Sequence, residues 1–442
     1  MTKKYPGRVV AVPACLSLAL GLVFGHALFS ANRLMRPAGQ PTDPQKNLLL
    51  EKIEKRLEAR RDELIETYRD LHRHPEVSGR EERTAGIIAG RLRSLGLEVR
   101  TGIGGHGVIG ILKGAQPGPV VAYRADMDAV FSDEPDPVSF RSETPGVRHI
   151  CGHDLHTTVA LGIADALTSV REELPGTVKF IFQPAEENVQ GARAMIEASA
   201  LENPTPEAIL AVHCAPVQVG QIAGKEGMLL AGFDLVTVTL EGEGDLKTTA
   251  QAAAKIITSV SSRNLQPPQA SRSPALPEEG RAGNDFILAM ITGTKEIPEK
   301  KQLVIRGLIR ASSEDHFETA QSKIQSGLEN LKVAGVAQRI EYVRGALPAV
   351  MNDPELVRVA ADTIRSLLGG EVLVEMSTVP PYFSEDFAYY LQKIPGVMYF
   401  LGVSNEDRGI IGMPHSPQFA VDEEAIFVGA RTMAVVLLGY LD

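Results

Sequence analysis

The sequence predicts an α/β fold, a mostly parallel sheet with helices on both faces, interrupted by a smaller inserted α+β domain. Short apolar strands alternate with helical segments over residues 46–232, which is typical of a parallel sheet. Residues 233–343 follow the order β-α-β-β-α-β, which is typical of a small open-faced sheet. Residues 344–442 return to the first pattern, and a chain of 442 residues is long enough for two domains.

Periodicity and breaking residues define the elements of the first part. Apolar spacing from Leu48 predicts a helix that stops near His74, because a residue that precedes proline disfavours the helical conformation. A second helix is expected from Glu81 to Leu95, with Gly96 after it. Further helices are expected near 155–172 and 190–200, and strands at 107–112, 120–124, 178–183 and 209–214.

The insert begins with a run, Phe233–Glu241, in which apolar and polar residues alternate as in a half-exposed strand. Residues 264–284 are rich in Pro, Ser, Arg and Gly and are expected to form a loop. The other elements of the insert are expected at 247–262 (helix), 286–292 and 302–310 (strands), 313–331 (helix) and 339–343 (strand). After the insert, the chain is expected to end in an apolar helix, Ala425–Leu441.

The N-terminus combines basic residues with an apolar run. Lys3, Lys4 and Arg8 precede an uncharged, largely apolar stretch from Val9 to Ala31. Such a pattern is typical of a secretory signal, and the run is also long enough to span a bilayer. We therefore expect residues 1–45 to be a signal peptide or membrane anchor with a linker, the alternative being a buried core helix. The remaining chain would be periplasmic, extracellular or anchored to a membrane.

Charge and cysteine content exclude other classes of protein. The net charge of −10 argues against a nucleic-acid partner, which would require a basic face. Three cysteines (Cys15, Cys151 and Cys214) are too few for a disulfide framework. A disulfide between Cys151 and Cys214 is the alternative to a metal-binding role for Cys151.

Two short segments carry ligand chemistry. Cys151 and His153 are separated by one residue and can hold a divalent ion through sulfur and nitrogen. Glu187 can add a carboxylate oxygen, which leaves the adjacent Glu186 free to accept a proton from water. Polar side chains also follow three predicted strands, where ligands gather in parallel sheets: Asp126 and Asp128, Glu186 and Glu187, and His213.

Several motifs together resemble the M20 metallopeptidase family, and most closely its amidohydrolase branch, the N-acyl-amino-acid and auxin-conjugate hydrolases. The resemblance covers residues 50–232 and 344–442. It rests on Arg-Ala-Asp-Met-Asp-Ala (124–129), Cys-Gly-His-Asp-Leu-His-Thr (151–157), Phe-Gln-Pro-Ala-Glu-Glu (182–187), Ser-Glu-Asp-Phe-Ala-Tyr-Tyr (384–390), Pro-Gly-Val-Met-Tyr-Phe-Leu-Gly (395–402) and Pro-His-Ser-Pro-Gln-Phe (414–419).

The resemblance implies two divalent ions, zinc or manganese with cobalt or nickel as alternatives, and Glu186 as general base. Its implied ligands are Cys151, His153, Glu187, His213 and His415. The sequence pattern alone predicts each of these ligands except His415, which without the resemblance would be interpreted as a solvent-exposed loop histidine. The implied reaction is hydrolysis of the amide bond of an N-acyl amino acid or a small peptide-like substrate.

Other residues have weaker assignments. Asp126 and Asp128 could orient the ligands from behind or cap helices. Asp154 and His156 could likewise support the ligands or the substrate, or cap and line the helix that follows. His72 and His74 resemble a family segment near the cleft, with a surface role as the alternative. Glu385 and Asp386 are expected to begin a helix, where acids favour the helix dipole.

The insert corresponds to the family's lid and dimerisation domain, which implies a homodimer, and its motifs diverge. A Gly-Gly-His-Ala segment, whose histidine holds the oxyanion, is replaced by Gly-Glu-Gly-Asp-Leu-Lys (242–247). The family's Asn-Val-Ile-Pro is replaced by Lys-Glu-Ile-Pro (295–298). Lys247 or Lys295 could substitute as a cation. Arg310 survives from a Gly-x-x-Arg motif and could hold a substrate carboxylate, or be an exposed strand residue.

These departures leave two functional hypotheses. The first is a working amidohydrolase with an altered substrate preference. The second is a catalytically weak descendant that binds metal and an acyl amino acid, since loss of one oxyanion donor costs on the order of 10²–10³ in turnover. The complete set of ligands and the retained Glu186 favour the first.

Overall fold

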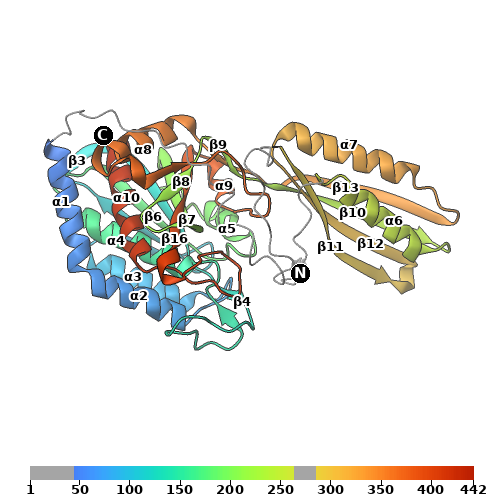
Figure 1. Cartoon of the computed structure of the whole chain (residues 1–442), viewed down its shortest axis with the longest axis horizontal. Coiled ribbons are helices and arrows are strands. Elements are labelled where there is room, and N and C mark those ends of the chain that lie inside the picture. The colour runs from blue at the N-terminus through green and yellow to red at the C-terminus, as the bar shows by residue number, and fades with distance from the viewer. Residues whose placement is uncertain (1–43, 263–284) are drawn as a thin grey trace, which may run out of the picture.

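The computed structural model describes residues 44–262 and 285–442. The expected signal or anchor segment, up to residue 43, and the expected loop at 264–284 lie outside the described residues. Figure 1 shows a larger α/β body and a smaller domain, the lid, that projects from one side of it.

The main body is built on a mixed, mostly parallel sheet of eight strands in the order β1-β2-β6-β3-β7-β16-β8-β15. The central pairs β6–β3, β3–β7 and β7–β16 are parallel, whereas the outer pairs β1–β2 and β2–β6 are antiparallel. The predicted sheet type is thus confirmed. The strands are β1 (Glu98–Ile103), β2 (Gly107–Lys113), β3 (Gln116–Asp126), β6 (Pro175–Gln183), β7 (Ala208–Gln218), β8 (Ile222–Gly224), β15 (Leu373–Glu375) and β16 (Gly396–Ser404).

Helices cover both faces of this sheet. Val108 and Ile109 are neighbours on β2 and enter different hydrophobic cores, because successive strand residues point to opposite faces. One core is covered by α1 (Pro44–Ala59), α2 (Arg61–Arg73), α3 (Glu82–Ser94), α4 (His153–Thr168), α8 (Pro354–Leu367) and α10 (Glu424–Leu441). The other is covered by α5 (Gly191–Glu197) and α9 (Ala388–Leu391). Short strands outside the main sheet are β4 (Val130–Phe131), β5 (Val147–Arg148), β9 (Gly227–Leu230) and β14 (Val350–Asn352).

The helix α10 is the one helix among the described residues that is long and apolar enough to cross a membrane. It packs against α4 and α8, and 72% of it is buried inside the protein. This is the environment of a core helix, and α4 beside it is likewise buried along almost its whole length.

The lid is a four-stranded antiparallel sheet in the order β11-β12-β10-β13, with two helices on one face (Figure 1). Alternate residues of the sheet, among them Val236, Val238 and Ile305, pack under these helices. The predicted order β-α-β-β-α-β is therefore present. The elements are β10 (Phe233–Gly242), α6 (Leu246–Ser259), β11 (Ile287–Ile297), β12 (Gln302–Ala311), α7 (Glu314–Asn330) and β13 (Val336–Leu347).

One predicted helix is two. The apolar spacing from Leu48 to His74 continues through a break at Arg60, whose φ of −110° and ψ of 6° lie outside the helical region. Asp62 and Glu63 then occupy the first turn of α2, where acidic side chains stabilise the positive end of a helix. The two helices keep one apolar face against the core, which is why periodicity alone merged them.

Candidate metal centre and active site

The carboxyl ends of neighbouring parallel strands bring the predicted residues to one edge of the sheet. β3 ends at Asp126, β6 ends at Gln183 just before Glu186 and Glu187, and β7 carries His213. α4 begins at the same edge with His153. The expected gathering of polar side chains at the strand ends is therefore present.

Five side chains form the centre of this edge. Cys151 Sγ lies 3.4 Å from His213 Nε2. His415 Nε2 lies 3.3 Å from Glu187 Oε1, and His153 Nε2 lies 3.9 Å from the same oxygen. The structure thus brings together every residue that the sequence suggests as a ligand, including the loop residue His415.

These residues fit divalent cations. His153 Nε2 and Glu187 Oε1 are buried and make no hydrogen bond to any described residue, although buried polar atoms normally have partners. The donor atoms of Cys151, Glu187 and His415 lie within 4.8 Å of one another, as do those of Cys151, His153 and His213. Sulfur, imidazole nitrogen and carboxylate oxygen at this spacing form a donor set that suits a metal such as zinc.

The backbone around Cys151 and His153 requires a glycine between them. Gly152 has a φ of 85°, and a Cβ at this position would lie 2.6 Å from the sulfur of Cys214. Cys214 is a free thiol, and its Sγ–H donates to the carbonyl oxygen of Cys151 at 2.9 Å. The alternative disulfide between the two cysteines is therefore wrong.

The His415 loop is fixed to the same segment. The backbone N–H of His415 donates to the carbonyl oxygen of Ile150 at 2.7 Å, and His415 itself has a φ of 59°. This turn directs the imidazole toward Glu187.

Asp126 and Asp128 contact the histidines, and neither caps a helix. Asp126 Oδ1 lies 2.6 Å from His156 Nδ1, and Asp128 Oδ1 lies 3.2 Å from His153 Nδ1. His156 Nε2 in turn accepts from the backbone N–H of Cys214 at 2.8 Å. Carboxylates of this kind orient imidazoles that hold metals, which favours the orienting role among the two alternatives.

His72 is buried, and a surface role for it is wrong. Its Nδ1 lies 2.7 Å from Asp154 Oδ2 and its Nε2 lies 3.1 Å from Asp136 Oδ2. Burial disfavours a charge on this imidazole, but the bonds to Asp136 and Asp154 outweigh it and raise the pKa of His72 to about 9. His74, in contrast, is half-exposed and lies beside Asp70.

A buried cluster around Arg124 is the main feature that sequence reasoning missed. The Arg124 guanidinium donates to Asp126 at 2.6 Å, Glu385 at 2.9 Å and Asp386 at 3.0 Å. Its Nε donates to Gln183 at 2.9 Å. Glu385 and Asp386 were expected to begin a helix, and they do lie directly before α9, but both are also buried against Arg124. The available signal was that Arg124 and Asp126 share one side of a strand.

The surroundings shift the pKa values of the adjacent Glu186 and Glu187 in opposite directions. Burial raises the pKa of Glu186 well above the usual range of a carboxyl, and the charges of Glu385 and Glu187 add to the rise. Burial acts on Glu187 in the same direction, but His415 and His153 outweigh it and lower the pKa of Glu187 to about 2. Two carboxyls whose pKa values are pushed apart can take different roles in acid–base chemistry.

The lid carries one candidate residue near the main body. Arg310 Nη1 donates to the carbonyl oxygen of Tyr382, which belongs to the main body. Among the described residues no carboxylate pairs with Arg310, its Nε has no hydrogen-bond partner, and burial lowers its pKa to about 10. Arg310 is thus not an exposed strand residue, and it is available to an anion.

The two lid lysines lie elsewhere. Lys247 lies in the first turn of α6 and pairs with Glu296. In Figure 1, α6 begins at the end of the lid that points away from the main body. Lys295 pairs in register with Val304, far along the sheet from Arg310, which pairs with Leu288. Within one chain both lysines lie far along the lid from Arg310, and substitution of either for the missing oxyanion histidine stays a prediction.

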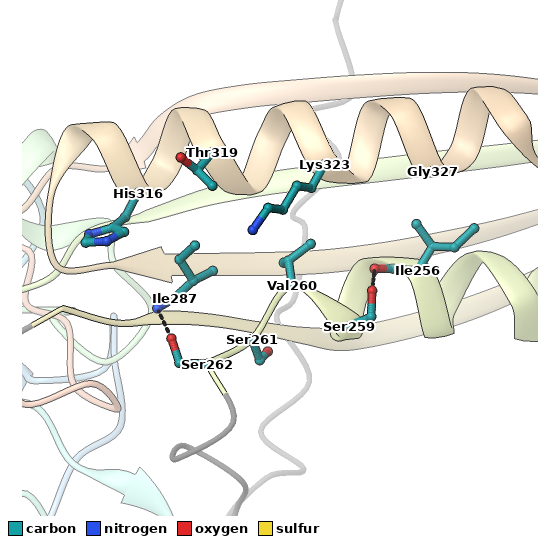
Figure 2. A pocket seen from close by; sticks show the side chains of 10 residues that line it. All are labelled: Ile256, Ser259, Val260, Ser261, Ser262, Ile287, His316, Thr319, Lys323 and Gly327. Carbon is teal, nitrogen blue, oxygen red and sulfur yellow. Dashed lines mark hydrogen bonds between the residues drawn. The ribbon is translucent and has the colours of Figure 1, made fainter. Parts of the chain in front are cut away.

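A groove of about 700 Å³ runs between α6 and α7 of the lid (Figure 2). His316 and Lys323 lie on its α7 side, and Ser259 to Ser262 lie on the opposite side. Its lining includes no cysteine or carboxylate, so it is separate from the candidate metal centre.

The sequence is similar to those of known hydrolases. Residues 122–439 match the model of peptidase family M20/M25/M40. Thermostable carboxypeptidase 2 of Saccharolobus solfataricus is 30% identical over 412 residues, which are 89% of this chain and 99% of the relative. IAA-amino acid hydrolase ILR1-like 4 of Arabidopsis thaliana is 32% identical over 395 residues, 86% of each chain.

A solved structure agrees with these sequences. The YXEP protein of Bacillus subtilis, described as a dinuclear metal binding peptidase of the M20 family, is similar with a TM-score of 0.71 and 30% identity. The similarity covers 87% of this chain and 99% of that protein.

Proposed function

We propose that this chain, which belongs to peptidase family M20/M25/M40, hydrolyses the amide bond of an N-acyl amino acid or a small peptide-like conjugate. It is an enzyme of the amidohydrolase and carboxypeptidase type within that family. In this proposal Glu186 is the general base. Two divalent ions, zinc or manganese with cobalt or nickel as alternatives, are held by Cys151, His153, Glu187, His213 and His415. The observation that carries the proposal is the protonatable Glu186 directly beside this set of donors.

When bound, the cations would polarise the scissile carbonyl and make water a stronger nucleophile. The Glu186 carboxylate accepts a proton from the attacking water as its oxygen bonds to the carbonyl carbon. Glu186 then gives that proton to the nitrogen as the C–N bond breaks. A raised pKa suits a group that must both take and return a proton. The products are a carboxylic acid and an amino acid.

The substrate class is supported by the relatives and by Arg310. One relative is a carboxypeptidase and another hydrolyses amino-acid conjugates of IAA, according to their names. Both names fit a substrate with a free carboxylate next to the scissile amide. Arg310, a half-buried cation without a carboxylate partner among the described residues, is suited to bind that carboxylate.

A direct assay tests the proposal. The purified protein is loaded with zinc, manganese or cobalt and offered a panel of N-acyl amino acids and dipeptides, and release of the amino acid is measured. Hydrolysis of at least one substrate class is expected. Stoichiometric metal binding without release in any metal form would instead support the second candidate, a catalytically weak descendant, which the absence of a histidine from segment 242–247 favours.

We also propose where the enzyme acts and how it assembles. The basic and apolar N-terminal sequence supports export or anchoring of the enzyme, and N-terminal sequencing of the mature protein in separated membrane and soluble fractions would test this. Membership of the family supports a homodimer through the lid, which sedimentation of the metal-loaded protein would test.

A further inference from the structure

We propose that Glu81 is a positioning residue that holds the backbone of Ala185 and thereby aims Glu186, and this rests on the proposed role of Glu186 as the base. Glu81 lies just before α3, far from Ala185 in the sequence and outside the set of metal donors. It contacts neither a metal donor nor the expected substrate position through any hydrogen bond among the described residues.

The residue that Glu81 holds has an unusual backbone. Ala185 has a φ of 56°, in the left-handed region that residues with a Cβ rarely adopt. It directly precedes Glu186, so its backbone angles set the direction in which the Glu186 side chain leaves the turn. Such a conformation persists only where the surroundings enforce it. The N–H of Ala185 donates to Glu81 Oε1 at 2.8 Å.

Glu81 is built into the protein in a way that suits this task. Its relative exposure is 0%, and the same Oε1 also accepts from the N–H of Gly79 at 2.9 Å. Oε2 has no hydrogen-bond partner among the described residues, and no described cation pairs with the carboxyl. Burying an acid without a cation costs free energy, and the two hydrogen bonds that Glu81 accepts from backbone N–H groups offset part of that cost.

The carboxylates of Glu81 and Asp128 together hold the backbone N–H groups of residues 185–187. Asp128 accepts from the N–H groups of Glu186 and Glu187, both at 3.1 Å, while Glu81 accepts from that of Ala185. Three consecutive amides are therefore held from two sides. Loss of Glu81 removes the acceptor of the Ala185 N–H, whereas Asp128 still holds the next two amides and the carbonyl of Ala185 still accepts from Gly191. The turn is then held from one side only, so the direction of the Glu186 side chain is expected to shift while the metal donors stay in place.

The test compares three variants of the full-length, metal-loaded protein. Glu81→Ala is expected to lower kcat roughly 10- to 100-fold, as for other residues that support a site from behind, with KM and metal content unchanged. Glu81→Gln keeps the accepting oxygen and alters only the unpartnered one, so it is expected to restore most of kcat. Glu76→Ala is the matched control. It also removes a carboxylate that accepts from two N–H groups, those of Arg83 and Thr84, but it has no contact with Ala185.

The outcomes separate the possible explanations. Wild-type kcat in Glu81→Ala, a parallel loss of bound metal, no recovery in Glu81→Gln, or an equal loss of kcat in Glu76→Ala would each overturn the proposal. Glu186→Gln is measured alongside, because turnover that survives in that variant refutes the proposed base itself. If Glu81→Ala does not fold, Glu81→Ala combined with Ala185→Gly replaces it, since glycine adopts positive φ without strain. Most of kcat is expected to return in that double variant, because the glycine no longer needs Glu81 to hold its positive φ, and a kcat that stays low in a folded, metal-loaded double variant would overturn the proposal.

Discussion

Glu187 and His415 meet at 3.3 Å, although one follows a central strand of the first half of the chain and the other lies on a loop close to its end. The contact closes the candidate metal centre, because the oxygen of Glu187 has no hydrogen bond among the described residues and His415 lies beside it. The His415 loop is itself pinned to Ile150, next to Cys151.

Replacing His415 should weaken metal binding. His415→Ala removes one of the five donors and is expected to lower the affinity for the divalent ion at least tenfold, as loss of even a supporting residue does. Metal content after dialysis against a weak chelator measures this. His74→Ala, a half-exposed histidine outside the cluster, is the control and should retain full metal. Equal metal content in both variants would contradict the assignment of His415.

Glu186→Gln should stop the reaction and spare the metals. The amide cannot accept the proton of water, so kcat is expected to fall by on the order of 10²–10⁴. Metal content should match the unaltered protein, because Glu186 is not among the five proposed donors. Single-turnover release of amino acid and metal analysis of the same sample measure both quantities. A variant that keeps its turnover would show that another group is the base.

Arg310 should affect substrates according to their charge. Arg310→Ala is expected to raise KM roughly 10- to 100-fold for substrates with a free carboxylate, because a charge-assisted hydrogen bond contributes about 1.5–3 kcal/mol. The corresponding amides of the same substrates lack the carboxylate and should respond little. Arg306→Ala, an exposed arginine on the same strand, is the control. An equal effect on acids and amides would argue for a structural role.

Arg124 should be important for stability. Arg124→Leu leaves Asp126, Glu385 and Asp386 buried without their cation and is expected to lower the free energy of unfolding by about 3–5 kcal/mol. Urea denaturation followed by circular dichroism measures this change. A loss of less than about 1 kcal/mol, as is typical of an exposed pair, would mean that the cluster is not a buried network in solution.

The His72 contacts predict a pH dependence of stability. The folded-state pKa of about 9 exceeds the ordinary value of 6.5, so the folded state binds the proton more tightly than the unfolded state. Its stabilising contribution is fully present below pH 6.5 and is lost as the pH rises toward 9. Unfolding measured across this window should show a decline that is absent in His72→Gln. An identical decline in both proteins would assign it to other groups.

Much of the site followed from the sequence because it depends on local order. The positions of Asp126, Glu186 and His213 at strand ends could be predicted, since parallel strands end at a common edge. His415 could be connected only through the family resemblance, because its place depends on a turn and on one backbone bond to Ile150.

Other features depend on contacts that no local pattern records. The partners of Arg124 on the segment at 385–386 are distant in sequence, and acidic residues before a short helix read equally well as a helix start. The distance of Lys247 from the centre depends on the direction in which β10 leaves the main body. Glu81 gave no signal of its link to Ala185, because the bond joins a side chain to a backbone amide.

The contact between Glu187 and His415 also fixes an order of events during synthesis. Four donors emerge from the ribosome before the lid, and the fifth emerges only after the lid and most of the second half have been made. A nascent chain thus offers an incomplete set of donors until nearly its last residues. With the five proposed donors, full metal affinity is expected only once the fold is complete.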